Sequence, residues 1–156
     1  MTVEDKQQLE HSIEIAATPA DVWAAVSDVR RMSEWSPQVE STRLRNGAND
    51  VALGVEFTNL NSKDGLKWTT HGTVVRLEPA REIAFRINEN WVIWSLRLEP
   101  TPRGGTQLTQ RRETPDGMSP ASQQSVEDYL GGHVAFTELM SIGMRQTLQA
   151  IKTAVE

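Results

Sequence analysis

His133 and Tyr129 are the side chains best suited to move a proton in this chain, and they stand four residues apart in its C-terminal part. An imidazole exchanges a proton near neutral pH, and a phenol donates a hydrogen bond to a carbonyl oxygen. Arg112 adds a positive charge that could stabilise negative charge developing on a reacting oxygen. These three residues are therefore the candidate catalytic groups, for chemistry that combines proton transfer with stabilisation of an oxyanion.

Each candidate also has an explanation that involves no chemistry. His133 could be satisfied at a pocket edge or on a helix surface, and Tyr129 could pack at a pocket mouth with its hydroxyl in water. His71 has the opposite strand parity to Trp68 and Thr70, so we expect it to face solvent or the short helices and rank it below His133.

Arg112 shares strand alternation with Leu108 and Gln110, which predicts that it points inward. A buried guanidinium needs an acidic partner or an anionic ligand. Arg111 is then the arginine that faces solvent, unless a bulge exchanges the two. Gln110 and Asn59 could orient a ligand without taking part in a reaction.

Other kinds of site find no support in the sequence. It contains no Gly-x-Ser-x-Gly, phosphate loop, dinucleotide fingerprint or paired carboxylates. The chain has no cysteine, and its histidines, His11, His71 and His133, lie far apart and in no metal-ligand spacing. We therefore expect neither a metal nor a cofactor.

The elements that must position these residues follow from the hydrophobic pattern. Residues 9–16 alternate as a half-buried strand, and Thr18-Pro19 predicts the start of a helix over residues 19–27, with a second short helical turn over 29–35. Six more strands, paired sequentially and antiparallel, are expected at residues 39–44, 55–61, 66–77, 82–88, 91–99 and 106–114.

After Ser119-Pro120 the pattern is helical to the C-terminus. One face of this helix is expected to carry Leu130, Val134, Thr137, Ser141, Met144, Leu148, Ile151 and Val155, widened by an adjacent stripe of Tyr129, His133, Phe136 and Met140. Gly131-Gly132 makes a kink or a break plausible, because each glycine costs roughly 1 kcal/mol in a helix interior.

The order of elements and several short motifs resemble the START-like, or SRPBCC, superfamily, specifically its bacterial polyketide cyclase/dehydrase and lipid-transport branch. The motifs are residues 18–23 (TPADVW), 27–28 (SD), 34–37 (EWSP), 77–79 (LEP), 98–100 (LEP) and 104–106 (GGT), with the helix around 143–148. The resemblance implies an α+β helix-grip fold, in which a seven-stranded curved antiparallel sheet surrounds a long C-terminal helix, with two short helices after the first strand. It covers nearly the whole chain, so we expect a single domain over residues 1–156, ordered from about 8 to 155.

Composition limits the partners. The net charge is -5 with scattered basic residues, so nucleic acid is a poor partner. No run approaches the ~20 apolar residues of a membrane span, and the N-terminus is polar and acidic, so we expect a cytoplasmic protein without integral membrane association. We expect a monomer or weak dimer.

The resemblance also implies an apolar cavity between sheet and helix. The residues predicted to line it are Trp35, Phe57, Trp68, Thr70, Phe85, Ile87, Trp94, Leu96, Gln110, Tyr129, His133, Phe136, Met140 and Met144. The alternative is that these side chains simply fill the core.

Three functions remain open. The first is binding of a hydrophobic, polyketide-like or lipid-like small molecule. The second, implied by the resemblance, is a polyketide aromatase/cyclase or dehydratase that acts on such a ligand without a metal or nucleotide cofactor. The third is a protein-interaction or stress-related module, which predicts an exposed apolar patch.

Overall fold

A computed structural model describes residues 9–129 and 132–156, and within them the side chains of residues 9–124 and 134–156. The elements follow in the order β1 (Leu9–Ile15), α1 (Pro19–Val26), η2 (Val29–Glu34), β2 (Val39–Leu44), β3 (Glu56–Lys63), β4 (Leu66–Glu78), β5 (Glu82–Ile87), β6 (Ile93–Pro100), β7 (Thr106–Glu113), α2 (Pro120–Tyr129) and α3 (Gly132–Val155). Each predicted strand is present, with boundaries within two residues of those expected.

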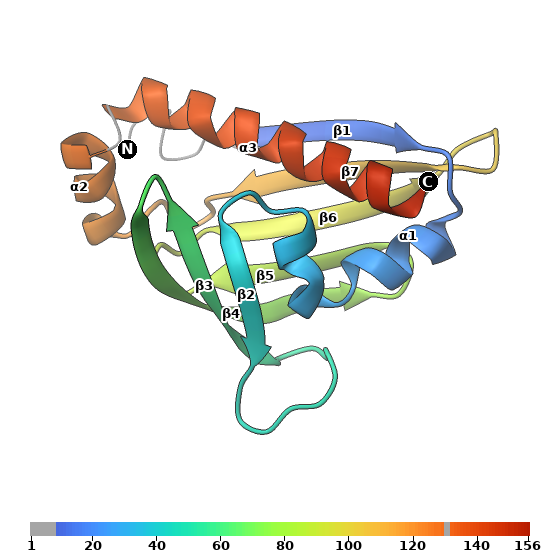
Figure 1. The fold of residues 1–156 in the computed structure, drawn as a ribbon, viewed down its shortest axis with the longest axis horizontal. Coiled ribbons are helices and arrows are strands. Elements are labelled where there is room, and N and C mark those ends of the chain that lie inside the picture. The colour runs from blue at the N-terminus through green and yellow to red at the C-terminus, as the bar shows by residue number, and fades with distance from the viewer. Residues whose placement is uncertain (1–8, 130–131) are drawn as a thin grey trace.

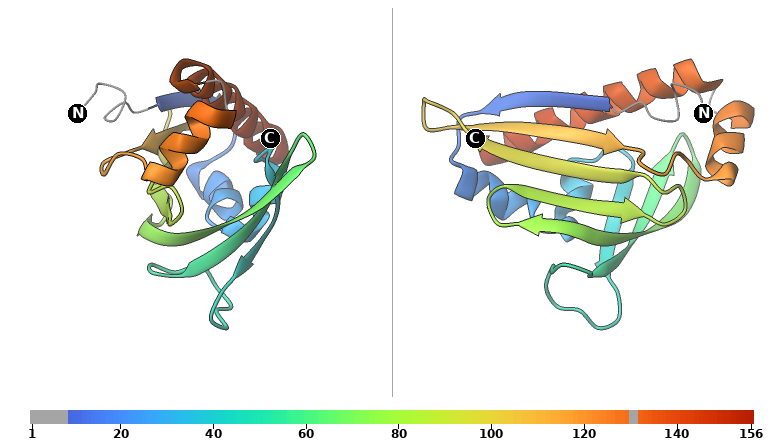
Figure 2. Two further views of the ribbon diagram at one scale, coloured as in Figure 1. Left: turned by 90° about the vertical axis from the view of Figure 1, so that its left-hand side faces the viewer. Right: turned by 180° about the vertical axis from the view of Figure 1, so that it is seen from behind.

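The strands form one antiparallel sheet in the order β1-β7-β6-β5-β4-β3-β2. The consecutive strands β2 to β7 pair as hairpins, and β1 closes the far edge against β7. The sheet curls so that α3, α1 and η2 lie on its concave side (Figure 1), and the view from behind shows the strands in front of the helices (Figure 2). This is the helix-grip fold expected from the sequence.

Turn chemistry sets the hairpin between β3 and β4. Asp64 and Gly65 have φ of 52° and 83°, and the flanking Lys63 and Leu66 pair directly. Two successive positive φ angles between paired strands are typical of a type I′ turn, which Asp-Gly favours. This turn joins the strands that were expected at residues 55–61 and 66–77.

Caps fix the two short helices. Thr18 Oγ1 accepts a hydrogen bond from the Asp21 amide at 3.2 Å, and Pro19 occupies the first turn of α1. Asp28 caps η2 in the same way, accepting from the Arg30 amide at 3.0 Å. Both helices begin where the sequence predicted, and η2 is a 3-10 helix.

The structure describes the C-terminal helical segment as α2, which ends at Tyr129, and α3, which begins at Gly132. Leu130 and Gly131 lie outside the described residues, so the predicted kink or break stays a prediction, as does the expected stripe through the side chains of Tyr129 and His133. Val134 was placed wrongly, since 77% of it is exposed. The buried side of α3 carries Phe136, Met144, Thr147, Leu148 and Ile151, because the helix docks this line of residues against β1 and α1.

The tightest packing lies toward the C-terminal end of α3. Ile15, Val22, Leu108, Leu148 and Ile151 are almost completely inaccessible and belong to one apolar cluster. This cluster joins β1, α1, β7 and α3, and Figure 1 shows the C-terminus ending near α1. None of the helices in the described ranges is long and apolar enough to cross a lipid bilayer.

Gly143, inside α3, offers a stability test. A Cβ built there meets no atom within 4 Å, so alanine should fit and should gain the helix propensity that glycine lacks. We expect Gly143→Ala to raise the free energy of unfolding by about 1 kcal/mol, measured by urea denaturation. A loss of stability would show that the space beside Gly143 does not accommodate a methyl group.

Candidate functional site

Cross-strand pairing aligns the candidate residues on the concave face. Phe85 pairs with Trp94, and Trp94 pairs with Arg112, so the three side chains form a row across β5, β6 and β7. The next row along places Leu96 beside Gln110. Directly paired residues point to the same face of a sheet, so the predicted parity holds here and no bulge exchanges Arg112 with Arg111.

The structure brings most of the predicted cavity residues to this region. On the concave face of the strands lie Phe57, Trp68, Thr70, Phe85, Ile87, Trp94, Leu96, Gln110 and Arg112. Trp35 is buried in the core cluster directly after η2, while Phe136 and Met144 are buried on α3 and Met140 is half-buried. Their role as ligand contacts stays a prediction.

Burial is uneven along this concave face. Ile83, Leu98 and Leu108 are buried, whereas Phe85 and Trp94, on the same face, are only half-buried. Trp68 points inward by register, yet 38% of it is exposed. Inward-facing aromatic groups therefore keep accessible surface, although one of them, Phe85, packs against the core cluster.

One close approach shapes the middle of the face. The rings of Phe57 and Phe85 meet edge to face with centroids 5.3 Å apart. Phe57 lies over Gly72, where an added Cβ would come within 2.3 Å of the ring. The absence of a side chain at Gly72 is what allows Phe57 to be fully buried.

Arg112 is a charged residue on the concave face, with only 6% of its surface exposed. Its guanidinium lies 6.0 Å from the Trp94 ring centroid and 5.1 Å from that of Phe136, which places it between sheet and helix. Burial lowers the pKa of Arg112 to about 10. Within the described residues its hydrogen bond goes to the Met118 thioether, a weak acceptor at 3.8 Å, and no carboxylate pairs with it.

The neighbouring amides differ in how well they are satisfied. Asn59 accepts from Thr42 Oγ1 at 2.6 Å, and Asn61 donates to Thr70 Oγ1 at 3.0 Å. By contrast, Gln110 Oε1 is buried and has no hydrogen-bond partner among the residues that the structure describes. The suggested orienting role therefore suits Gln110 better than Asn59.

His11 is a concave-face residue that the site prediction left out. It pairs with Gln110 across β1 and β7, and burial followed by the charge of Arg145 lowers its pKa. The signal was present in the alternation that put His11 on the apolar side of the first strand. Its position two strands away from the aromatic set kept it out of the predicted cavity.

The side chains of Tyr129 and His133 lie outside the described residues. Their roles as proton donors and as ligand contacts therefore stay predictions. Among the described residues, no group of three or more His, Asp or Glu side chains could hold a metal ion.

Two polar groups expected to face away from the cavity lie on the convex side. Arg111 donates to Glu10 at 2.8 Å. His71 Nδ1 lies 2.6 Å from Glu89 Oε2, and the His71 amide donates to the other oxygen of that carboxylate at 2.7 Å. The Glu89 carbonyl in turn accepts from Ser119, so this loop connects β4 to the start of α2.

This connection predicts a pH-dependent contribution to stability. Burial alone would raise the pKa of Glu89, but hydrogen bonds from His71 outweigh it and lower the pKa below its usual value. The contribution is therefore present above about pH 4.5 and is lost as the pH falls through the lowered folded value. We expect Glu89→Gln to cost about 0.5–1 kcal/mol at pH 7 and less at pH 3.5 in urea denaturation.

The exposed Glu99, changed to glutamine, serves as the control for Glu89→Gln. It should leave the unfolding midpoint unchanged at both pH values. An equal loss in the two variants would mean that the Glu89 loop adds nothing specific.

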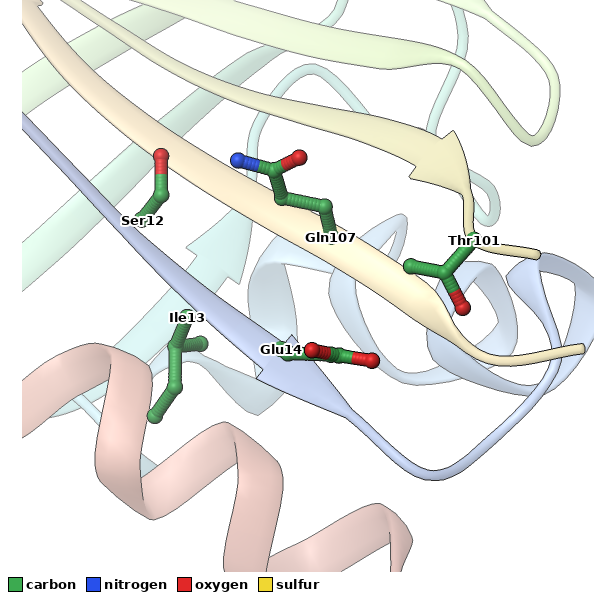
Figure 3. Close-up of a pocket in the computed structure, with 5 residues that line it drawn as sticks. All are labelled: Ser12, Ile13, Glu14, Thr101 and Gln107. Atoms are coloured by element: carbon green, nitrogen blue, oxygen red, sulfur yellow. The ribbon is translucent and has the colours of Figure 1, made fainter. Parts of the chain in front are cut away.

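A hollow of about 260 Å³ lies elsewhere, on the convex side of β1 and β7. Figure 3 shows Ser12 and Gln107 projecting from this face of the sheet while Ile13 points toward the helix. The hollow is open and mostly polar, with Glu14 and Thr101 at its rim. None of the predicted cavity residues lines it.

Sequence comparison connects the chain to a family. Residues 6–156 match the family described as polyketide cyclase / dehydrase and lipid transport. A comparison with curated proteins finds no match.

Solved structures of similar fold include three with informative descriptions. The di-domain ARO/CYC BexL from the BE-7585A biosynthetic pathway has TM-score 0.74 and 21% identity, covering 98% of this chain and 51% of that one. ZhuI aromatase/cyclase from Streptomyces sp. R1128 has TM-score 0.74 and 18% identity, covering 96% and 93%.

A Polyketide_cyc-like protein from Corynebacterium glutamicum, Cgl2372, has TM-score 0.60 and 29% identity, covering 93% of this chain and 88% of that chain. The chain spans about half the length of BexL and of the di-domain ARO/CYC StfQ. The likeness to BexL and ZhuI, below 25% identity, shows the shared fold.

Proposed function

The chain belongs to the polyketide cyclase / dehydrase and lipid transport family, and on that basis we propose that it binds an apolar, polyketide-like or lipid-like small molecule between the concave face and α3. The observation that carries the proposal is the burial pattern. Phe85, Trp94 and Trp68 point inward but keep accessible surface, although apolar aromatic groups on a covered face would be expected to pack fully.

The chemistry of this region fits an apolar ligand. Trp68, Trp94 and Phe85 offer rigid aromatic area, and Met140 on α3 offers a side chain that adapts to irregular shapes. Ring systems bind such surfaces through burial of apolar area, at about 25 cal/mol per Å².

A pair of adjacent threonines provides the test. Thr70 points inward beside the accessible aromatic groups, whereas Thr69 is exposed and pairs with Leu60 on the convex face. We expect Thr70→Trp to fill the ligand space and to weaken 2-naphthol binding about tenfold or more, measured by calorimetry. Thr69→Trp adds the same side chain outside the sheet and should bind like the unchanged protein. Equal binding by both variants would refute a site on the concave face.

Catalysis is a second candidate function, favoured by one observation: the buried Arg112 has no carboxylate partner in the described part of the chain. In a cyclase or dehydratase, Arg112 would hold developing enolate charge while His133 or Tyr129 supplied the proton. Turnover of a poly-β-ketone that is lost in His133→Ala or Tyr129→Phe, with binding retained, would favour this function.

A further inference from the structure

Arg112 departs from how this chain treats its half-buried arginines. Arg31, Arg76, Arg86 and Arg111 are half-buried, and each has a carboxylate within ion-pair distance. The adjacent Arg111 pairs with Glu10 on the convex face, at 2.8 Å. Arg112, which is far more buried, has no such partner among the described residues. An unpaired buried charge is costly, so its retention calls for a partner that the described residues do not provide.

The geometry of the guanidinium defines what such a partner must be. Trp94 and Phe136 lie within cation-π distance of it, at 6.0 and 5.1 Å. Aromatic rings satisfy the positive charge but accept the N–H groups poorly, and the Met118 sulfur is a weak acceptor. The planar edge of a guanidinium matches a carboxylate, which accepts two parallel hydrogen bonds.

Arg112 calls for a hydrogen-bond acceptor on the ligand, and Gln110 calls for a hydrogen-bond donor. It precedes Arg112 by two residues on β7, so both side chains leave the same face about 7 Å apart along the strand. Gln110 Oε1 is buried and accepts no hydrogen bond from the described part of the chain. A buried acceptor of this kind needs a donor, and a ligand hydroxyl would provide one.

We propose that the ligand of the concave face is a hydroxylated aromatic acid, whose carboxylate pairs with Arg112 and whose hydroxyl donates to Gln110 Oε1. This inference rests on the proposed function, because it assigns a substrate class to the same site. The ring system lies against Trp94 and the neighbouring accessible aromatic groups. No covalent step is required.

The test compares hydroxy-2-naphthoic acids, with the hydroxyl at different ring positions, with their neutral methyl esters and with 2-naphthoic acid, by calorimetry at pH 7. The unchanged protein should bind at least one hydroxy acid about tenfold or more tighter than its ester. Arg112→Met should abolish this preference, so that acid and ester bind with similar affinity, and Gln110→Leu should abolish the advantage of the hydroxy acid over 2-naphthoic acid. Arg111→Met, the matched control, should behave like the unchanged protein.

The outcomes separate the two proposals. If acids and esters bind equally, or if Arg112→Met keeps the preference for acids, the assigned ligand class is overturned while the binding function stands. If 2-naphthol, the acids and the esters all fail to bind, both proposals are overturned. Circular dichroism of each variant confirms that the fold is intact.

Discussion

Gly72→Ala is expected to lower the free energy of unfolding by about 3 kcal/mol, a large effect for a single added methyl group. The new Cβ would lie 2.3 Å from the Phe57 ring, which is fully buried and held edge-on by Phe85. Because φ at Gly72 is not positive, the cost comes from overpacking and not from backbone strain. Urea denaturation measures the change.

The double variant Gly72→Ala/Phe57→Leu separates this cause from others. Leucine removes the ring atoms that the new methyl group would meet, so the double variant should be more stable than Gly72→Ala alone, with a coupling energy of about 1 kcal/mol or more. Additive effects of the two substitutions would show that Phe57 is not what forbids a side chain at Gly72.

Arg112→Met is expected to have the second large effect, in the opposite direction. The lowering of the Arg112 pKa from its ordinary value to about 10 corresponds to a penalty of roughly 3 kcal/mol for the charged form in the fold. Methionine has a similar length, fills the space between Trp94 and Phe136 and carries no charge. We expect the free energy of unfolding to rise by about 1–3 kcal/mol.

The pH dependence of this gain follows from the direction of the shift. A cation with a lowered folded pKa destabilises the fold below that value, and the penalty fades only as the pH rises above about 10. The gain in Arg112→Met should therefore be constant from about pH 6 to 9. Arg111→Met should instead lose up to about 1 kcal/mol, since it breaks an exposed ion pair with Glu10. If Arg112→Met is the less stable of the two, the guanidinium has a structural role.

If Arg112→Met both stabilises the fold and loses acid binding, Arg112 is retained for function at a cost in stability. Such exchanges are common at binding sites. The unfolding free energy and the affinity for acids are measured independently on the same variant, so each prediction can be contradicted without the other.

Local sequence signals were enough to predict the strands of the sheet and the face on which each side chain lies. Asp64-Gly65 supplies the positive φ angles of a tight hairpin, and strand alternation placed Trp94 and Arg112 on one face before any pairing was known. The period of two makes this reliable, because a shift by one residue would expose the whole apolar side. The family resemblance supplied the curvature and the place of the helix.

The buried face of α3 was predicted well except near the start of the helix. Met144, Leu148 and Ile151 lie on the predicted face and are buried. Val134 fits the same face by spacing but is exposed, whereas Phe136 from the adjacent stripe is buried, because tertiary contacts decide which of two neighbouring apolar positions docks. Whether a side chain finds a partner is also a tertiary property, which is why Gln110 stood out only once its surroundings were known.

The central claim is that an apolar ligand binds against the accessible aromatic groups of the concave face. The most direct test is to follow the tryptophan indole N–H resonances while 2-naphthol is titrated into the intact protein. The account predicts saturable shifts for Trp68 and Trp94, with Trp23 on α1 unchanged. Resonances of Trp68 and Trp94 that stay unmoved up to saturating ligand would contradict it and would mean that these side chains fill the concave face themselves.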